Sequence, residues 1–215
     1  MTRMVVLISG NGSNLQALID AVEAGRLDGA ICAVISNRAE APGLQRARDH
    51  GIPAQVLDHR EFASRERFDA ALLEAIEHYR PDLVILAGFM RILSDHFVNH
   101  FSGRLINIHP SLLPRHKGLN THQRVLDAGD HEHGCSVHFV SCELDSGAVI
   151  GQARVPVCAD DDATTLAAKV QRQEHRLYPA CVQLLCTGQV RLTDRGVTYQ
   201  GQLLPPTGLD LTDSH

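Results

Sequence analysis

Short apolar runs alternate with amphipathic segments along the first half of the chain. Residues 4–9 (MVVLIS) are almost entirely apolar and rich in β-branched side chains, which predicts a strand buried on both faces. A glycine-rich turn follows, and then apolar residues recur at helical spacing. The same succession continues, with further strands predicted at 30–36, 54–57, 83–87 and 105–108 and helices at 44–50 and 64–79. This alternation predicts an α/β fold with a Rossmann-like, mostly parallel twisted sheet flanked by helices.

The pattern changes in the second half of the chain. Residues 135–140 and 148–157 are two strand-like runs separated by a Gly-containing turn, which predicts an antiparallel hairpin. A long helix is predicted from residue 163 to residue 185. Pro179 falls inside this helix, and we expect it to kink the helix because proline removes a backbone hydrogen bond.

Weak strand signals and two adjacent prolines occupy the end of the chain. We expect one domain over residues 1–206, with a first half at 1–100 and a second half at 101–206. Residues 207–215 are expected to form a loose tail.

Composition narrows the class of protein. The 215 residues are 44% hydrophobic and 21% charged, with a formal net charge of −5. A polyelectrolyte binder of nucleic acid would show a basic excess, so this class is excluded. The N-terminal apolar run is too short for a membrane span and lacks a signal-peptide pattern. Six cysteines without a C-x-x-C pair predict free, mostly buried thiols in a cytoplasmic protein.

The turn Gly10–Asn14 (GNGSN) lies between a predicted strand and a predicted helix. Backbone N–H groups and the helix dipole attract anions at such a position, and glycine allows close approach. Leu15 stands where a dinucleotide fingerprint needs glycine, and Asn37 stands where an acidic residue would hold a ribose. A single phosphate is therefore favoured over a nicotinamide cofactor. A plain turn capped by Ser13 or Asn14 explains the loop alone equally well.

Asn107 and His109 end a predicted buried strand, and Pro110 turns the chain away from it. Side chains two residues apart point to the same side of a strand, at the end where ligands bind in parallel sheets. This amide and imidazole could stabilise an oxyanion and transfer a proton, or form a structural hydrogen-bonded pair. Asp145, in a predicted turn, either serves the turn or faces His109, where a carboxylate favours the protonated ring.

Two further groups of polar residues have a structural and a functional interpretation. Gln171 and Glu174 share one face of the long helix, and Glu174 lies within or beside its apolar stripe. Its partner there is either an arginine or lysine side chain or a ligand amine or hydroxyl. The segment 131–133 (HEH) lacks the spacing of a helical metal motif, so we expect a solvated loop.

Taken in order, these motifs resemble the folate-dependent phosphoribosylglycinamide formyltransferases. The resemblance covers roughly residues 4–206, and residues 115–120 (RHKGLN) depart from it. The segments that carry it are 7–16 (LISGNGSNLQ), 86–93 (LAGFMRIL), 107–114 (NIHPSLLP), 133–138 (HGCSVH), 144–147 (LDSG), 171–175 (QRQEH) and Tyr178-Pro179.

The resemblance implies the formyltransferase fold, with the first half binding phosphate and the second half carrying the catalytic and folate groups. Asn107, His109 and Asp145 would be catalytic. The residues implied in binding the phosphoribosylglycinamide are Gly12, Ser13, Asn14, Gln171, Arg172, Gln173 and Glu174. Those implied in binding folate are Arg65, Met90, Arg91, Ile92, Leu93, Asn107, Ser141, Cys142, Glu143, Leu144 and Asp145.

The resemblance also implies an activity and its partners. The protein would pass the formyl group of 10-formyltetrahydrofolate, its co-substrate, to the amine of phosphoribosylglycinamide in purine synthesis, through a tetrahedral intermediate. No metal, nucleic acid or membrane would take part, and the protein would be a monomer or a homodimer.

Three other classes compete with this interpretation. Methionyl-tRNA formyltransferase and formyltetrahydrofolate hydrolase resemble the same core, but they would carry an extra C-terminal and an extra N-terminal domain respectively. A phosphate- or folate-binding module without catalysis could use the same fold. A nicotinamide-dependent enzyme is disfavoured by Leu15 and Asn37.

Overall fold

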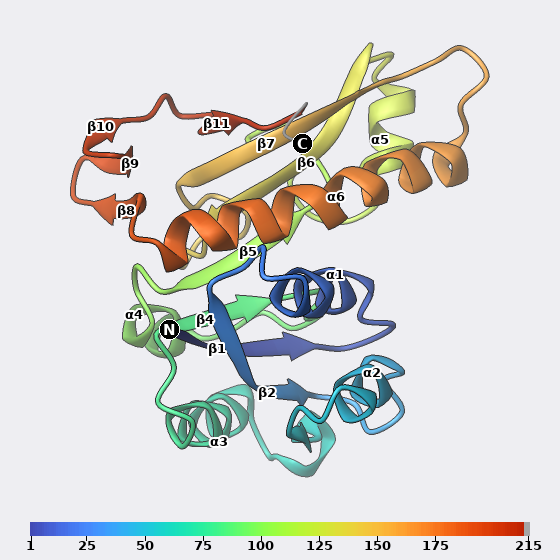
Figure 1. Cartoon of the computed structure of the whole chain (residues 1–215). Coiled ribbons are helices and arrows are strands. Elements are labelled where there is room, and N and C mark those ends of the chain that lie inside the picture. The colour runs from blue at the N-terminus through green and yellow to red at the C-terminus, as the bar shows by residue number, and fades with distance from the viewer. Residues whose placement is uncertain (213–215) are drawn as a thin grey trace. The chain divides into compact units, whose positions relative to one another are not determined.

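The computed structural model describes residues 1–212 and consists of two compact units, Met1–Asn107 and Ile108–His215 (Figure 1). The boundary between the units falls inside strand β5 (Leu105–His109). Each unit has a hydrophobic core of its own.

A parallel sheet forms the core of the first unit. Its strand order is β3-β2-β1-β4-β5, and every neighbouring pair runs in the same direction. The central strand is buried over most of its length, with Met4 to Ile8 at 0% exposure. Strands that are covered on both faces need such continuous apolar runs, so the predicted parallel sheet is confirmed. The bounds are β1 (Thr2–Ile8), β2 (Gly29–Ser36), β3 (Ala54–Val56) and β4 (Leu83–Leu86).

Helices connect the strands of this sheet. Helix α3 shows how the sequence sets them: the Ser64 side chain accepts a hydrogen bond from the N–H of Arg67, and Phe68, Leu72 and Ile76 form the buried stripe. Helix α1 packs against α2 and β2, and α3 packs against α4 (Figure 1). The helices are α1 (Ser13–Glu23), α2 (Gly43–Asp49), α3 (Arg65–Glu77) and α4 (Asp95–His100), with a 3-10 turn at His59–Glu61.

The second unit is built on the predicted hairpin and long helix. Strands β6 (Glu132–Phe139) and β7 (Val149–Pro156) pair antiparallel, as predicted. Helix α6 (Ala163–Cys186) packs against both strands and against α5 (Thr121–Asp127). A capping box at Asp162 starts α6, and the helix continues through Pro179.

Short strands complete the second unit. A small antiparallel sheet has the order β10-β9-β8 and consists of β8 (Val190–Thr193), β9 (Gly196–Tyr199) and β10 (Gln202–Leu203). Part of the expected loose tail is regular, because β11 (Leu209–Asp210) pairs parallel with β7. The N–H of Leu211 also donates to the carbonyl oxygen of Gln152, which fixes this segment on the hairpin. Residues 213–215 lie outside the described part of the chain.

Two further expectations were wrong. The segment 131–133 is not a solvated loop throughout: His131 and Glu132 are exposed, but β6 begins at Glu132, and His133 within this strand is 1% exposed. The cysteines are free, as expected, but they are not mostly buried: Cys135 and Cys181 are buried, Cys32 and Cys186 are half-buried, and Cys142 and Cys158 are exposed.

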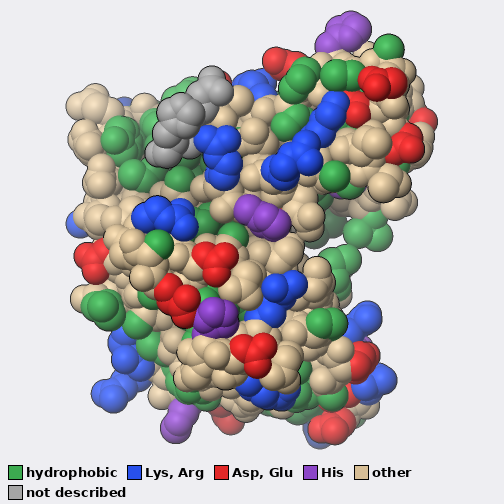
Figure 2. Space-filling view, turned by 45° about the vertical axis from the view of Figure 1, so that its right-hand side comes forward, with side chains coloured by type: hydrophobic (Ala, Val, Ile, Leu, Met, Phe, Trp, Pro, Cys, Tyr) green, Lys and Arg blue, Asp and Glu red, His purple; other side chains and the backbone are tan. Residues whose placement is uncertain are grey.

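Charged side chains of both signs share the surface. On the face shown in Figure 2, lysine and arginine side chains are scattered among aspartate, glutamate and histidine side chains. Within residues 1–212, no helix combines the length and the apolar character that a membrane crossing requires.

Helix α3 provides a test of the first core. Replacement of Leu72, which is 0% exposed, by alanine should lower the free energy of unfolding by about 2–5 kcal/mol, because it removes buried methyl groups and leaves a cavity. Urea unfolding measures this loss. The exposed Glu74→Ala on the same helix is the matched control and should stay within about 0.5 kcal/mol of the wild type. Equal losses in both variants would contradict the assigned core.

Candidate active site

The second unit brings His109 and Asp145 together. His109 is the last residue of β5, and Asp145 lies in the loop that joins β6 to β7. Their exposed fractions are 6% and 9%, and His109 Nδ1 is 3.5 Å from Asp145 Oδ2. Asp145 has a φ of +50°, an uncommon backbone conformation for a residue with a side chain. The loop therefore holds this carboxylate in a defined position facing the imidazole.

Backbone groups of the segment 116–118 complete this pair. The carbonyl oxygen of His116 lies 3.1 Å from His109 Nε2 and accepts its hydrogen when that nitrogen is protonated. The N–H of Gly118 donates to Asp145 Oδ2 at 2.9 Å. Sequence reasoning missed these two contacts, because a backbone group leaves no residue-type signal. They lie in the segment that departs from the family pattern, and backbone contacts tolerate a change of side chain.

The segment itself is anchored through side chains. His116 Nε2 is 2.7 Å from Asp130 Oδ2, and Arg115 forms an ion pair with the same carboxylate. These partners, led by the hydrogen bond from His116, hold the pKa of Asp130 below its usual value. Asp130 therefore ties the backbone that contacts His109 to the start of β6.

A second histidine faces Asp145 from β6. His138 Nε2 is 4.0 Å from Asp145 Oδ1, and its Nδ1–H donates to the carbonyl oxygen of Phe139 at 3.0 Å. Burial lowers the pKa of His138, which favours the neutral ring. Of the two histidines, His109 lies closer to the Asp145 carboxylate, and burial favours the neutral form of His138.

The predicted phosphate loop lies in the first unit. Gly12 has a φ of +74° and a Cβ there would be 2.8 Å from the Cα of Gly43, so only glycine fits. Helix α1 begins at Ser13, and its N-cap residue is Gly12, which has no side chain to cap the helix. Asn37 stands where a dinucleotide site would need a carboxylate. It is 2% exposed, and its Oδ1 accepts a hydrogen bond from Ser9 Oγ.

The implied folate residues of the first unit are Arg65, at the start of α3, and Met90 to Leu93, in the segment after β4, together with Asn107 in β5. Met90 and Ile92 are 62% and 64% exposed, and Leu93 is buried. The guanidinium of Arg91 lies 5.2 Å from the centre of the Phe68 ring. Arg65 is exposed at the start of α3, where its Nε is 3.6 Å from a carboxylate oxygen of Glu66. Exposed apolar side chains beside cationic ones suit an aromatic ligand with an acidic end.

The remaining implied residues lie in the second unit. In the β6–β7 loop, Leu144 is 56% exposed and Cys142 and Glu143 are exposed, while Ser141 Oγ donates to the Glu143 carbonyl oxygen at 3.0 Å. On α6, Gln171 and Arg172 are exposed, and Gln173 and Glu174 are half-buried. Asn107 ends the first unit and belongs to β5 together with His109.

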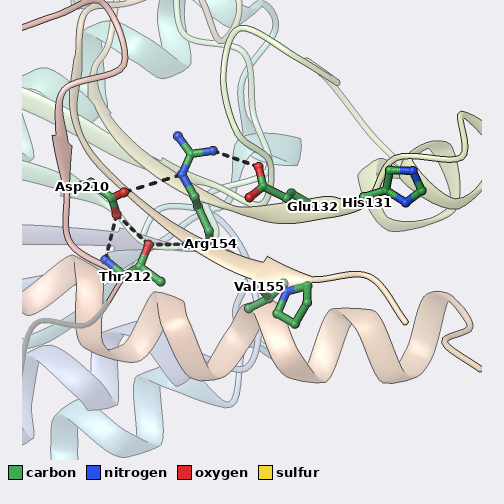
Figure 3. A pocket seen from close by; sticks show the side chains of 7 residues that line it. His131, Glu132, Arg154, Val155, Asp210 and Thr212 are labelled. Atoms are coloured by element: carbon green, nitrogen blue, oxygen red, sulfur yellow. Dashed lines mark hydrogen bonds and ion pairs between the residues drawn. The ribbon is translucent and has the colours of Figure 1, made fainter. Parts of the chain in front are cut away.

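Two cavities lie in the second unit. One, of about 690 Å³, runs along β6, β7 and β11, and Figure 3 shows the Arg154 guanidinium between the carboxylates of Glu132 and Asp210. None of its lining residues is a predicted site residue. The other, of about 440 Å³, is lined by Asp145 and Lys117 together with apolar residues that include Leu203. The second cavity is therefore the one that borders the histidine–carboxylate pair.

This arrangement limits the chemistry. A buried imidazole beside a carboxylate suits proton transfer and stabilisation of a developing negative charge. Within residues 1–212, no group of three or more histidine, cysteine, aspartate or glutamate side chains is placed to hold a metal ion. The parallel sheet, the glycine loop at a helix start and the histidine–carboxylate pair are those of an α/β group-transfer enzyme.

Comparisons with known proteins agree with this class. The family model described as "Formyl transferase" matches residues 2–182. The phosphoribosylglycinamide formyltransferase of Escherichia coli (strain K12) is 53% identical over 205 residues, which is 95% of this chain and 97% of that protein. The trifunctional purine biosynthetic protein adenosine-3 of Bos taurus is 48% identical over 194 residues, 90% of this chain and 19% of that protein.

A solved structure extends the similarity to three dimensions. The phosphoribosylglycinamide formyltransferase of Coxiella burnetii has a TM-score of 0.94 and 48% identity, and the match covers 97% of this chain and 98% of that one. The chain belongs to the formyl transferase family, and within it to the phosphoribosylglycinamide formyltransferases.

Two facing histidines beside the site, the buried His133 and the half-buried His122, form a contact that depends on pH. His122 Nδ1 is 2.9 Å from His133 Nε2, a contact that needs one of the two facing nitrogens unprotonated. Burial, together with the nearby His122, lowers the pKa of His133 to about 4, and burial also lowers the pKa of His122. The neutral pair joins α5 to β6.

The lowered pKa of His133 predicts that the free energy of unfolding decreases in acid. The folded-state pKa of His133 is below the unfolded value of about 6.5, so the unfolded chain binds the proton more tightly. The contribution of the neutral ring to the free energy of unfolding is fully present above the unfolded-state pKa of about 6.5. It is lost as the pH falls from about 6.5 towards 4, at up to about 1.4 kcal/mol per pH unit. The free energy of unfolding of His133→Gln should fall less between about pH 7.5 and 5 than that of the wild type.

The exposed His131→Gln is the control for this prediction and should keep the wild-type pH dependence. An unchanged pH dependence in His133→Gln would show that the ring is not held neutral.

Proposed function

We propose that this protein transfers the formyl group of 10-formyltetrahydrofolate to the amine of N1-(5-phosphoribosyl)glycinamide, in de novo purine synthesis. The observation that carries the proposal is the buried His109–Asp145 pair, in a chain 53% identical to the phosphoribosylglycinamide formyltransferase of Escherichia coli. Acyl transfer to an amine passes through an oxyanion and moves one proton, and an imidazole held by a carboxylate can serve both steps.

The proposed reaction begins when the acceptor amine attacks the formyl carbon. The carbonyl π bond opens and leaves a tetrahedral intermediate with a negative charge on oxygen. The Asn107 amide and the Nε2–H of the protonated His109 ring donate hydrogen bonds to that oxygen, which takes the place of the His116 carbonyl oxygen as the acceptor for Nε2, while Asp145 orients the ring from the Nδ1 side and stabilises its charge. The oxygen electron pair then re-forms the carbonyl, and the bond from carbon to folate N10 breaks. The proton from the amine reaches N10 through His109 or water, which releases tetrahydrofolate.

We assign the acceptor to two groups of residues. Gly12, Ser13 and Asn14 bind the phosphate, which is supported by the left-handed Gly12 at the N-cap position, where the residue has no side chain between the helix start and a ligand. Gln171, Arg172, Gln173 and Glu174 bind the ribosylglycinamide. The half-buried Glu174 carboxylate then has a ligand amine or hydroxyl within its reach.

We assign folate binding to two chain segments, residues 90–93 and 141–145, and to the single residues Arg65 and Asn107. Met90, Ile92 and Leu144 support this assignment, because their large apolar side chains are more than half exposed and so accessible to a ligand ring. The full set is Arg65, Met90, Arg91, Ile92, Leu93, Asn107, Ser141, Cys142, Glu143, Leu144 and Asp145. We further propose that the reaction takes place in the cytoplasm without a metal ion, in a monomer or a homodimer.

The test follows the absorbance of 10-formyltetrahydrofolate with and without phosphoribosylglycinamide. Deformylation that requires the amine is the expected result. Equal deformylation without the amine would indicate a hydrolase, and no deformylation in either case would indicate a binding module; both outcomes would overturn the proposal.

Replacement of His109 should separate chemistry from folding. His109→Ala should lower turnover by about 10²–10³-fold, because it removes one donor to the oxyanion. The control is His131→Ala, since His131 is exposed and lies outside the proposed site, and it should keep wild-type turnover. Steady-state kinetics at saturating folate and acceptor measures both. Near-normal turnover in His109→Ala would remove His109 from the mechanism.

A further inference from the structure

Helix α2 packs directly against the predicted phosphate loop, residues 10–14. The N–H of Gly43, the first residue of α2, donates to the carbonyl oxygen of Gly10 at 3.0 Å. A Cβ on Gly43 would lie 2.6 Å from Ile8 Cδ1 and 3.2 Å from the Cα of Gly12. Contacts this short leave no room for a side chain, so the loop backbone and the start of α2 are in direct contact.

Arg46, one turn further along α2, contacts the same loop with its guanidinium. Its Nε donates to the Asn11 carbonyl oxygen at 2.8 Å and one terminal nitrogen to Asn11 Oδ1 at 3.0 Å. The other terminal nitrogen donates to Gln16 Oε1 at 3.3 Å, in the first turns of α1. A planar guanidinium makes such a fork with fixed geometry, so one side chain fixes the loop and the start of α1 together.

The position of Gln16 is itself fixed from the other side. Its amide nitrogen donates to Asp20 Oδ1 at 2.8 Å and lies 3.3 Å from His50 Nε2. His50 Nδ1 is 2.6 Å from Glu23 Oε1, so the proton is on Nδ1 and Nε2 accepts from Gln16. With both amide hydrogens engaged in this way, the Gln16 oxygen faces Arg46.

The charge of Arg46 is not neutralised within the unit. Its guanidinium donates to the neutral oxygens of Asn11 and Gln16, and within residues 1–212 no carboxylate lies within ion-pair distance of it. A cation beside the N–H groups at the start of α1 adds to their positive potential, and both effects favour an anion.

We propose that Arg46 is a positioning residue for the phosphate of the acceptor substrate. It holds Asn11 so that the N–H groups of Gly12 to Asn14 keep the orientation that phosphate needs, and it contributes an unpaired positive charge beside them. This inference rests on the proposed function, because the phosphate is that of phosphoribosylglycinamide. The inference concerns recognition of the phosphate and leaves formyl transfer to other groups.

The experiment compares phosphoribosylglycinamide with its dephosphorylated analogue. For each enzyme, the ratio of kcat/KM for the two acceptors measures how strongly the phosphate is used. In Arg46→Ala this ratio should fall by about tenfold or more, mainly through KM, because charge-assisted hydrogen bonds are lost. The KM for 10-formyltetrahydrofolate should stay near that of the wild type, and Arg46→Lys, which keeps the charge without the fork, should be intermediate.

Arg48→Ala is the matched control, because Arg48 is exposed on the same helix, and it should keep the wild-type ratio. An unchanged ratio in a folded Arg46→Ala would overturn the inference. If Arg46→Ala does not fold, the ratio in Arg46→Lys decides in the same way. Absence of turnover in the wild type would reject the proposed function instead, so the two failures are distinguishable.

Discussion

Burial of the central strand β1 from Met4 to Ile8 is the constraint on which the rest of the first unit depends. Met4 to Ile8 have no exposed surface, so every backbone group there must pair with β2 or β4. The chain therefore leaves the sheet abruptly after Ile8 and turns within a few residues into α1. Gly12, in the left-handed conformation, makes this turn possible, and Gly43 lets α2 approach it. The turn places a glycine at the N-cap of α1, so that an anion can approach the backbone N–H groups at the helix start.

Burial sets a similar constraint in the second unit, where the buried groups that need partners are polar side chains. A buried imidazole or carboxylate is costly without partners, and here each of them has one. His109 and Asp145 face each other. The His116 carbonyl oxygen lies against His109 Nε2, and the Gly118 N–H donates to the Asp145 carboxylate. His138 adds a neutral ring instead of a second charge, since burial lowers its pKa. The fold thus limits the number of buried charges while it holds one proton carrier next to one carboxylate.

The order of apolar and polar residues along the chain predicted the secondary-structure elements, because these depend on local residue type. The apolar runs and the stripe on α3 predicted the parallel sheet, the hairpin and the long helix, and the strand end at His109 predicted half of the pair. What failed depends on pairing at a distance: His133 is buried because β6 pairs with the end of β7, and Leu209 is fixed because the edge of β7 accepts it. The backbone contacts of residues 116–118 and the fork of Arg46 leave no periodic signal. Order along the sequence does not reveal them, since each depends on which segments the fold brings together.

The central claim is that the formyl carbon moves from folate N10 to the acceptor amine within one active site. Its most direct test supplies 10-formyltetrahydrofolate labelled with ¹³C in the formyl group, together with phosphoribosylglycinamide, and follows the labelled carbon by NMR. The account predicts that the label appears as a formamide on the acceptor, in equal amount to the tetrahydrofolate released. Label that appears as free formate while the acceptor stays unlabelled would contradict it.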